Sequence, residues 1–313
     1  MMDLSIICPT YNEIHFITQV VQDLCAEDGL KKEIFIVDGG STDGTVDKIK
    51  ILQERHSNLK YIPNPRKTST AAFNIGCDAA TGEFIAFVGA HANYSANYFS
   101  KGVEILRSGI CDAVGGTLAQ KGKSEKGRAI AFVMSSKAGV GNTEFRTSKE
   151  KMFVDSVAFA LYRKSVVMAV GKMDESLPVN QDDEFHYRLN AKGHKILMTP
   201  EMSATYFVRD NYSKLFKQYF KYGYFKPLVL KKVQGSVRMR HLIPSAFVLY
   251  LLTLPLALLY QILALPLACY LILIVLLSFS MKDSVSVKIL AIPVFPVLHI
   301  SYGSGFILGL LKK

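Results

Sequence analysis

Short apolar runs alternate with amphipathic segments along the amino-terminal part of the chain. The runs have the length and the β-branched and aromatic content of buried strands, and the segments between them carry apolar residues at helical spacing. Strands that alternate with helices predict an α/β domain with a mostly parallel sheet and helices on both faces. We expect strands at residues 4–8, 33–37, 59–62 and 84–88, and helices at residues 13–25, 45–55 and 70–80.

The hydrophobic pattern changes in the last quarter of the chain. No Asp, Glu, Lys or Arg occurs from Leu242 to Met281, and a second uncharged run extends from Ile289 to Leu311. A helix crosses a bilayer core with roughly 20 residues, so the first run is long enough for two passes and the second for one. Five prolines interrupt these runs, which leaves short, broken or re-entrant segments as an equal alternative. We expect two or three transmembrane helices at the carboxyl end.

The composition narrows the class of protein. The chain has 313 residues, of which 50% are hydrophobic and 20% are charged, with a formal net charge of +11. This hydrophobicity excludes a disordered chain, and this charge excludes a mere bundle of membrane helices. The sequence predicts three regions, namely an α/β domain in residues 1–208, a basic, aromatic and amphipathic juxtamembrane segment in residues 209–241, and a membrane region in residues 242–313.

Basic residues gather beside the predicted membrane region. Residues 209–240 contain nine Lys or Arg and a single acid, Asp210. Positive charge next to a membrane segment marks the cytoplasmic side and attracts anionic lipids. We therefore expect a multi-pass protein of the plasma (inner) membrane with its α/β domain in the cytoplasm and membrane lipids among its partners. Because lipid attraction accounts for the charge, we expect no nucleic-acid binding.

Two further features favour the cytoplasmic side. The five cysteines are scattered, without the spacing of a disulfide framework or a metal site. The first residues lack the basic segment of a signal peptide. Reduced, buried thiols in a cytosolic compartment explain this pattern best.

The candidate chemistry follows the predicted strands. PTYNE comes after the first strand and DGGSTDG after the second. In parallel sheets ligands bind outside the carboxyl ends of the strands, and glycines let the backbone approach a ligand closely. A glycine-rich turn with a helix cap would explain the second segment equally well. Neither G-x-G-x-x-G nor a P-loop sequence occurs.

Taken together, the motifs carry a resemblance. PTYNE followed by VDGGSTDGT resembles the opening of family 2 glycosyltransferases, inverting enzymes with the GT-A, Rossmann-like fold. NPRKTSTAAFNIGCDAATGEFIAFV is similar to the segment before their metal-binding loop, QDDEFHYRL to their catalytic-base motif, and QYFKYGYFK to their acceptor-side segment. The resemblance runs from about Leu4 to Pro244. It is strongest to the membrane-anchored enzymes of succinoglycan-type exopolysaccharide assembly.

The resemblance implies roles for individual residues. It places Asp182 as the base that takes the proton of the acceptor hydroxyl, with Asp183 as the fallback and Glu184 as a second acid. Each implied role has a plainer alternative: loop charges for Arg66 and Lys67, a helix-cap cluster for the acids, and interfacial anchoring for the aromatic–basic helix. For the donor, the resemblance implies that Pro9, Tyr11 and Glu13 line the nucleobase pocket and that Asp38 reaches the base. It places Arg66, Lys67 and Asn74 near the ribose or diphosphate, Gln218 and Tyr222 over the donor phosphates, and Gly89 at the first position of the cation-binding triplet.

Two motifs depart from the family pattern. Gln181 stands where the catalytic-base motif has a glutamate, although an amide can still form hydrogen bonds, and the metal-binding triplet is also altered. A D-x-D or D-x-H triplet holds a divalent cation in that family, but here the triplet is Gly89-Ala90-His91. Glycine supplies no ligand, and a lone imidazole suits Mn²⁺ or Zn²⁺ better than Mg²⁺. Three alternatives remain open. A divalent cation, Mn²⁺ or Mg²⁺, is held by the diphosphate, water and His91; basic residues replace the cation; or donor binding is impaired.

These inferences lead to one function and one alternative. We expect a membrane-bound glycosyltransferase that moves a sugar from a nucleotide-sugar donor to a lipid-linked or polysaccharide acceptor in surface or exopolysaccharide synthesis. Two or three membrane segments are too few for a translocation pore, which favours single-sugar transfer. Other polysaccharide-assembly proteins are further candidate partners. The alternative is a catalytically impaired, membrane-bound scaffold that binds nucleotide or glycan.

Overall fold

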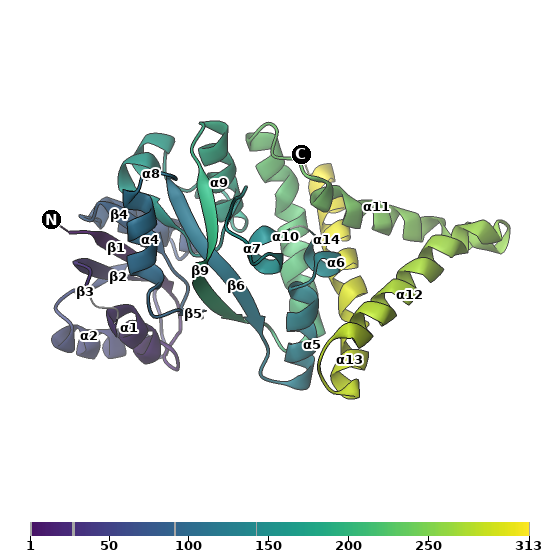
Figure 1. Ribbon diagram of the computed structural model, residues 1–313, viewed down its shortest axis with the longest axis horizontal. Helices are drawn as coiled ribbons and strands as arrows, with labels where there is room; N and C mark the ends of the chain where they lie inside the picture. Colours follow the sequence, from purple (N-terminus) through teal and green to yellow (C-terminus); the bar gives the residue numbers. More distant parts are fainter. Residues whose placement is uncertain (1, 27–28, 91, 142, 313) are drawn as a thin grey trace. The chain divides into compact units, whose positions relative to one another are not determined.

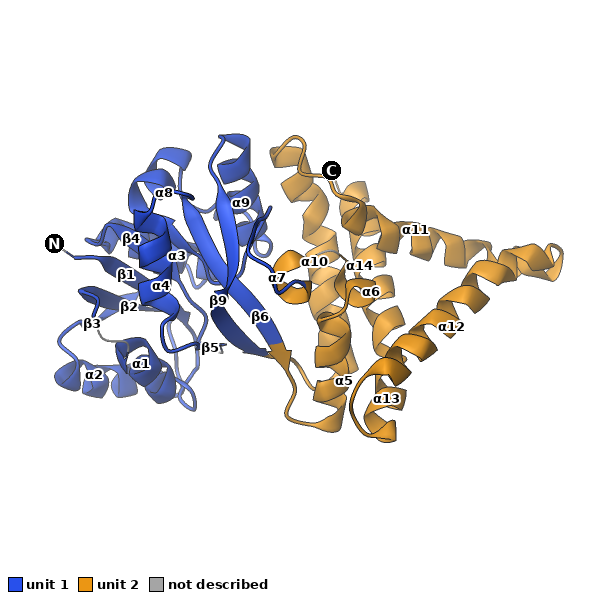
Figure 2. Ribbon diagram, viewed as in Figure 1, with its two compact units in different colours: residues 1–119, 148–206 blue, residues 120–147, 207–313 orange. Residues whose placement is uncertain are grey.

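The computed structural model describes residues 2–26, 29–90, 92–141 and 143–312. The chain forms two compact units (Figure 2). Unit 1 contains residues 1–119 and 148–206, and unit 2 contains residues 120–147 and 207–313. Residues 120–147, which lie within the expected amino-terminal domain, thus cluster with the carboxy-terminal helices.

A nine-stranded mixed sheet forms the centre of unit 1 (Figure 1). Four strands are parallel, in the order β3-β2-β1-β4, and the others extend the sheet beyond β4 in the order β8-β6-β9-β5, with β7 paired to β9. The strands are β1 (Leu4–Thr10), β2 (Lys32–Asp38), β3 (Leu59–Pro63), β4 (Phe84–Phe87), β5 (Ala92–Tyr94), β6 (Ala113–Lys121), β7 (Met152–Phe153), β8 (Leu161–Arg163) and β9 (Ile196–Phe207). The expected α/β sheet is confirmed, with antiparallel strands added at one edge.

The order of the parallel strands explains why helices cover both faces. The chain moves from β1 to β2 to β3 in one direction and then returns across the sheet to β4. Because such crossovers are right-handed, the return helix lies on the opposite face from the first two helices. All seven residues of β2 are buried, as expected for a strand covered on both faces. The direction changes between β1 and β4, and ligands bind at such a switch point.

The helices of unit 1 agree with the predicted ones where predictions were made. α3 packs against β1 and β2, and α2 packs against β3. The first helix begins four residues later than its spacing predicts, because residues 13–16 form a turn. The helices are α1 (Ile17–Ala26), α2 (Thr45–Arg55), α3 (Ser69–Ala79), α4 (Tyr98–Arg107), α8 (Lys164–Val170) and α9 (Gln181–Ala191).

Unit 2 is helical apart from the ends of two strands of the sheet. Three of its helical stretches, Met239–Leu258, Gln261–Ser280 and Val285–Leu311, are long and apolar enough to cross a membrane, by length and composition alone. The helices are α5 (Glu125–Met134), α6 (Lys137–Val140), α7 (Glu144–Thr147), α10 (Tyr212–Lys232), α11 (Met239–Thr253), α12 (Leu265–Ser280), α13 (Val285–Ala291) and α14 (Val294–Leu311), with 3₁₀ turns at Leu254–Leu258 and Gln261–Ala264.

Glycines allow α10 and α14 to pack closely. A Cβ atom on Gly223 would lie 2.1 Å from the carbonyl oxygen of Tyr302, and one on Gly305 would lie 2.2 Å from that of Phe220. Small residues let helix backbones approach in this way. The basic, aromatic helix predicted around residues 218–226 therefore lies against the last apolar helix of the chain.

Candidate active site

Asp38 ends β2, and its carboxylate organises the loop that follows. The side chain is 1% exposed. Its Oδ2 atom accepts hydrogen bonds from the backbone N–H groups of Gly40 (2.8 Å) and Ser41 (2.9 Å), and its Oδ1 atom accepts one from the Ser41 hydroxyl. Gly40 has a φ of +85°, which L side chains rarely adopt. The carboxylate therefore has a structural task in this turn, and its contact with a nucleobase stays a prediction.

The loop after β1 is joined to the loop after β2 by reciprocal hydrogen bonds. The N–H of Asn12 donates to Ser41 Oγ (2.8 Å), and the N–H of Thr42 donates to Asn12 Oδ1 (2.9 Å). The N–H of Glu13 donates to Thr45 Oγ1 (2.8 Å). The structure thus brings PTYNE and DGGSTDGT together at the carboxyl edge of the parallel strands. We call the surface of these two loops the β1–β2 edge.

Besides Asp38, three of the predicted donor-binding residues lie at the β1–β2 edge. Pro9 pairs with Val37 across the two strands, and Glu13 is buried. Tyr11 is 54% exposed, and a Cβ atom on Gly39 would lie 3.5 Å from its ring. An exposed aromatic ring beside a glycine backbone can pack against a planar ligand.

The loop after β3 lies against the same edge. The N–H of Asn64 donates to the carbonyl of Asp38 (2.7 Å). Lys67 has a φ of +58°, and its Cα would be 3.5 Å from a Cβ atom on Gly39. Of the two predicted basic residues, Lys67 therefore has its backbone directly against the glycine loop.

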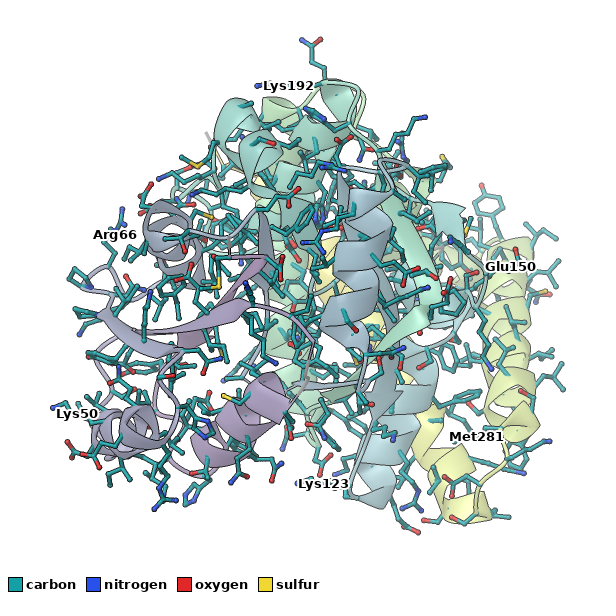
Figure 3. The ribbon with its side chains drawn as sticks, turned by 60° about the vertical axis from the view of Figure 1, so that its left-hand side comes forward. Lys50, Arg66, Lys123, Glu150, Lys192 and Met281 are labelled. Carbon is teal, nitrogen blue, oxygen red and sulfur yellow. The ribbon has the colours of Figure 1, made fainter. Side chains whose placement is uncertain are left out.

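Arg66 and Asn74 both contact the segment that follows α8. Arg66 Nη1 lies 2.7 Å from Glu175 Oε1, and about half of the Arg66 side chain is exposed at the surface (Figure 3). Asn74 Nδ2 donates to the carbonyl of Met173 and to Glu175 Oε1, both at 2.9 Å, and Asn74 Oδ1 accepts from the N–H of Met173 (3.0 Å). The Asn74 amide therefore forms hydrogen bonds within the protein. Its contact with the ribose or diphosphate of a donor stays a prediction.

An aromatic ring fills the space beside Gly89. The N–H of Gly89 donates to the Tyr94 hydroxyl (2.8 Å). A Cβ atom at this position would lie only 2.8 Å from Cε1 of Phe159, and the rings of Phe159 and Tyr94 pack edge to face with centroids 5.5 Å apart. A carboxylate side chain at position 89 would therefore require Phe159 to move.

The described residues do not fit a cation held by protein side chains. No group of three or more His, Cys, Asp or Glu is arranged to hold a metal ion in the part of the chain that the structure describes. The predicted ligand His91 lies outside the described residues. Gly89 offers no side-chain donor atom, and the Phe159 ring occupies the neighbouring space.

The first turn of α9 carries the predicted acid cluster. Glu184 is 2% exposed, and both of its carboxylate oxygens accept hydrogen bonds from Arg188 one turn later. Arg188 also donates to the backbone carbonyls of residues 170–172. Glu184 thus fixes the helix to the loop after α8. Asp182 and Asp183, both half-buried, are the better placed carboxylates for acid–base chemistry.

A hydrogen bond ties these acids to the loop after β3. Gln181 Nε2, at the start of α9, donates to Ser69 Oγ (3.2 Å). Ser69 is the first residue of α3, and Lys67 lies two residues before it. The structure therefore brings the acid cluster and the β1–β2 edge to neighbouring positions in unit 1.

Sequence reasoning missed three buried residues beside the acids. Ser156 Oγ donates to Asp183 Oδ1 (3.0 Å) and lies 3.0 Å from His186 Nδ1. His186 Nε2 lies 2.8 Å from the Tyr162 hydroxyl. The spacing of Asp183 and His186, three residues apart on one helix, was the available signal, since residues i and i+3 share a helix face. Ser156 and Tyr162 had no comparable signal, because only the tertiary structure brings them to the helix.

Gln218 and Tyr222 lie on α10, in unit 2. Gln218 Nε2 donates to the Tyr222 hydroxyl (2.8 Å), and Gln218 Oε1 accepts from Arg209 Nε (3.2 Å). The hydroxyl of Tyr219, between them, accepts from Arg146 Nη1 (3.2 Å). The predicted helix and its aromatic–basic face are present, and the role of these residues toward the acceptor stays a prediction.

Comparisons with known proteins agree with this architecture. The sequence model of Glycosyl transferase family 2 matches residues 5–171. The chain is 32% identical over 260 residues to the dolichyl N-acetyl-alpha-D-glucosaminyl phosphate 3-beta-D-2,3-diacetamido-2,3-dideoxy-beta-D-glucuronosyltransferase of Methanococcus voltae, covering 80% of each chain. It is 31% identical over 244 residues to the succinoglycan biosynthesis protein ExoA of Rhizobium meliloti, covering 77% of this chain and 74% of the relative.

A solved structure shows the same fold. The mannosyltransferase PcManGT of Pyrobaculum calidifontis, in complex with GDP-Man and Mn²⁺, aligns over 99% of this chain and 87% of its own, with a TM-score of 0.64 and 16% identity. This likeness confirms the expected GT-A-like fold. With the family match and the two curated relatives, it shows that the chain is a glycosyltransferase and belongs to glycosyl transferase family 2.

Proposed function

We propose that this enzyme transfers one sugar from a nucleotide diphosphate sugar to a lipid-linked or polysaccharide acceptor, with inversion at the anomeric carbon. The observation that carries the proposal is the hydrogen bond from Gln181 to Ser69, which ties the carboxylates of α9 to the loops at the ends of the parallel strands. The names of the two relatives, a transferase for a dolichyl-linked sugar phosphate and a succinoglycan biosynthesis protein, support synthesis of a surface or exported glycan.

The donor fits the β1–β2 edge. Tyr11 offers an exposed ring for the nucleobase, and Pro9, Glu13 and Asp38 lie at the same edge. The leaving diphosphate develops negative charge as the sugar departs, and preorganised donors stabilise that charge. We assign this task to Lys67 and Arg66, in the loop that follows β3 and lies against the same edge.

The chemical step needs a base for the acceptor. The acceptor hydroxyl attacks the anomeric carbon, the bond from that carbon to the diphosphate oxygen breaks, and a carboxylate takes the hydroxyl proton. Asp182 takes that role, with Asp183 as the alternative. A single displacement from the face opposite the diphosphate inverts the anomeric configuration.

A membrane-borne acceptor fits the carboxy-terminal region. The three apolar helical stretches would anchor the enzyme in the plasma (inner) membrane, with the catalytic unit in the cytoplasm. The basic, aromatic helix α10 carries Gln218 and Tyr222 and would face acceptor and anionic lipid at the membrane surface. An acceptor sugar on a lipid phosphate projects only a short way from the bilayer and suits such a site.

Release of nucleoside diphosphate from a panel of sugar nucleotides tests the proposal. Native membranes with a lipid-linked acceptor extract would be assayed with Mn²⁺, with Mg²⁺ and with a chelator. We expect release from one donor in the panel, and a loss of roughly 100-fold or more in Asp182→Asn, since general-base catalysis contributes that much.

The matched control is Asp23→Asn, an aspartate of α1 that accepts a hydrogen bond from Gln19 of the same helix (2.8 Å). This variant is expected to keep the wild-type rate. Release that stops in chelator and returns with Mn²⁺ would show a required cation and overturn the assignment of charge neutralisation to the basic residues. Nucleotide binding without release from any donor would favour the scaffold alternative.

A further inference from the structure

Four side chains of unit 1 form a continuous chain of hydrogen bonds that ends on the acid cluster. The chain runs from Tyr162 on β8 through His186 on α9 to Ser156 and then to Asp183, with successive distances of 2.8, 3.0 and 3.0 Å. Its members come from a strand, a helix and the loop between β7 and β8, so that only the folded unit assembles it. We call it the Tyr162 relay.

The Asp183 carboxylate, at the end of the Tyr162 relay, determines which group donates and which accepts in every hydrogen bond of the relay. An ionised carboxylate only accepts, so the single proton of the Ser156 hydroxyl points to Asp183. Ser156 Oγ must then accept from His186, which places the imidazole proton on Nδ1. In that neutral tautomer Nε2 is an acceptor, and it receives the Tyr162 hydroxyl proton. Every donor in the relay therefore points toward Asp183.

The inner members of the relay do not change charge near neutral pH. His186 is 0% exposed and Tyr162 is 2% exposed. Burial lowers the pKa of His186 to about 4, although the charge of Asp183 opposes this change. Burial raises the pKa of Tyr162 well above its usual value. The relay is thus a fixed set of dipoles and not a route by which a proton reaches the solvent.

We propose that Ser156, His186 and Tyr162 are positioning residues, which hold one oxygen of Asp183 and keep the adjacent carboxylates of α9 ionised and oriented for the transfer reaction. This inference rests on the proposed function of the acid cluster. The inference also applies to Asp182, because the N–H of Asp183 donates a hydrogen bond to Asp182 Oδ1 (3.0 Å). Neither the family match nor the resemblance of QDDEFHYRL assigns a role to these three residues.

Several titratable groups of the described residues lie beside the relay. Asp182 and Asp183 lie on its own helix, and Asp155 precedes Ser156 in the loop. Cys77 of α3 and Tyr98 of α4 interact electrostatically with Tyr162. Because Asp182 and Asp183 are adjacent, we attribute the acidic limb of the pH–rate profile to the two carboxylates together, whichever of them is the base.

The pH dependence of turnover tests the inference in the full-length, membrane-embedded enzyme. A hydrogen bond donated to a carboxylate favours its charged form. Removing it in Ser156→Ala is therefore expected to move the acidic limb of the kcat profile to higher pH by about one unit. We expect kcat at neutral pH to fall about tenfold while KM for the sugar nucleotide stays within about twofold, because orientation of the base affects the chemical step and not donor binding.

Conservative variants separate positioning from a merely structural role. The amide nitrogen of Asn reaches the place of imidazole Nδ1 and that of Gln the place of Nε2, so His186→Asn is expected to retain more activity than His186→Gln. Tyr162→Phe removes only the hydrogen bond between Tyr162 and His186, which is the one farthest from Asp183. It should shift the acidic limb of the kcat profile less than Ser156→Ala does. Tyr250→Phe is the matched control, because it also removes a tyrosine hydrogen bond to a backbone carbonyl, that of Leu263 (2.7 Å), and lies on α11 in unit 2. It should leave the acidic limb of the kcat profile in place.

A second readout does not depend on turnover. The ¹⁵N spectrum of histidine-labelled protein should contain a neutral Nδ1–H ring that does not titrate between pH 5.5 and 8 and that is missing in His186→Asn. Active enzyme whose acidic limb stays unchanged in Ser156→Ala would overturn the inference. Wild-type protein that releases nucleotide from no donor would instead refute the proposed function, while the spectrum would still report the relay.

Discussion

The hydrogen-bond partners of individual side chains determine which polar groups are available for the transfer reaction. Sequence motifs suggested similar roles for several acids and amides, but the structure separates them by their partners. Glu184 is buried in an ion pair with Arg188, and Asn74 binds the backbone of Met173, so both stabilise the fold. Asp183 instead accepts from Ser156, a residue far from it in sequence. The partner of a side chain, and not its type, distinguishes a structural carboxylate from a candidate base.

Gly89 provides a prediction at this scale. Gly89→Ala would bring a methyl group to 2.8 Å from the Phe159 ring, and overpacking of this kind typically costs about 1–3 kcal/mol. We expect a lower midpoint of thermal unfolding in lipid nanodiscs. Gly39→Ala is the control, because its Cβ would be 3.5 Å from the nearest atoms, and it should unfold at nearly the wild-type temperature. Equal unfolding midpoints for the two variants would mean that the Phe159 ring moves aside without a loss of stability.

Among the elements, hydrophobic periodicity predicted the strands and helices of the first 88 residues well, because each carries its own apolar pattern. It did not indicate that α5, α6 and α7 pack with the carboxy-terminal helices. Arg128 of α5 pairs with Asp283 (2.9 Å), and the carbonyl of Ala138 in α6 lies 2.9 Å from His299 Nε2 of α14. Such contacts join segments more than 150 residues apart, and local spacing carries no information about them.

The crossing of α10 and α14 yields a prediction at the scale of elements. Gly305→Ala would place a methyl group 2.2 Å from the carbonyl oxygen of Phe220, and a backbone atom cannot move aside as a flexible side chain can. We expect the helices to be forced apart, with a loss of about 1–3 kcal/mol of stability and a lower unfolding temperature in nanodiscs. Leu308→Ala, at an exposed position of the same helix, should change the temperature little. A Gly305→Ala protein as stable as wild type would show that α10 and α14 do not pack this closely.

At the scale of the whole molecule, α11 and α12 form an apolar helical hairpin, and residues 120–147 contact the chain at both of its ends. α11 and α12 meet at a tip (Figure 1), where Leu258 is 90% exposed. At one end of the hairpin Arg240 lies 3.8 Å from Glu144, and just beyond the other Asp283 pairs with Arg128. Glu144 and Arg128 both belong to residues 120–147, so the two ends of the hairpin lie on the same side of any membrane that it enters.

Labelling with a membrane-impermeant maleimide tests this arrangement. Met239→Cys and Lys282→Cys, near the two ends of the hairpin, should react in sealed vesicles of the same orientation, which we expect to be the one that exposes the cytoplasmic face. Tyr260→Cys at the tip should not react from that face. Wild-type protein gives the background from Cys25, which is half-buried, and Cys269, which is exposed, whereas Cys8, Cys77 and Cys111 are buried. Each variant is compared with that background, and detergent should expose all three introduced thiols. Reaction of Met239→Cys and Lys282→Cys from opposite faces would contradict a hairpin with both ends on one side.

The sequence by itself determined the α/β class, the apolar carboxy-terminal region and the loops that hold the candidate donor site, because each depends on residues close together in the chain. It also located the acids at the start of a helix, from the spacing of Phe185 and Leu189. Only the tertiary structure decided the antiparallel extension of the sheet, the ring beside Gly89 and the relay from Tyr162 to Asp183. These features arise where distant segments bury their side chains against one another, and the partner of a buried group depends on the whole fold.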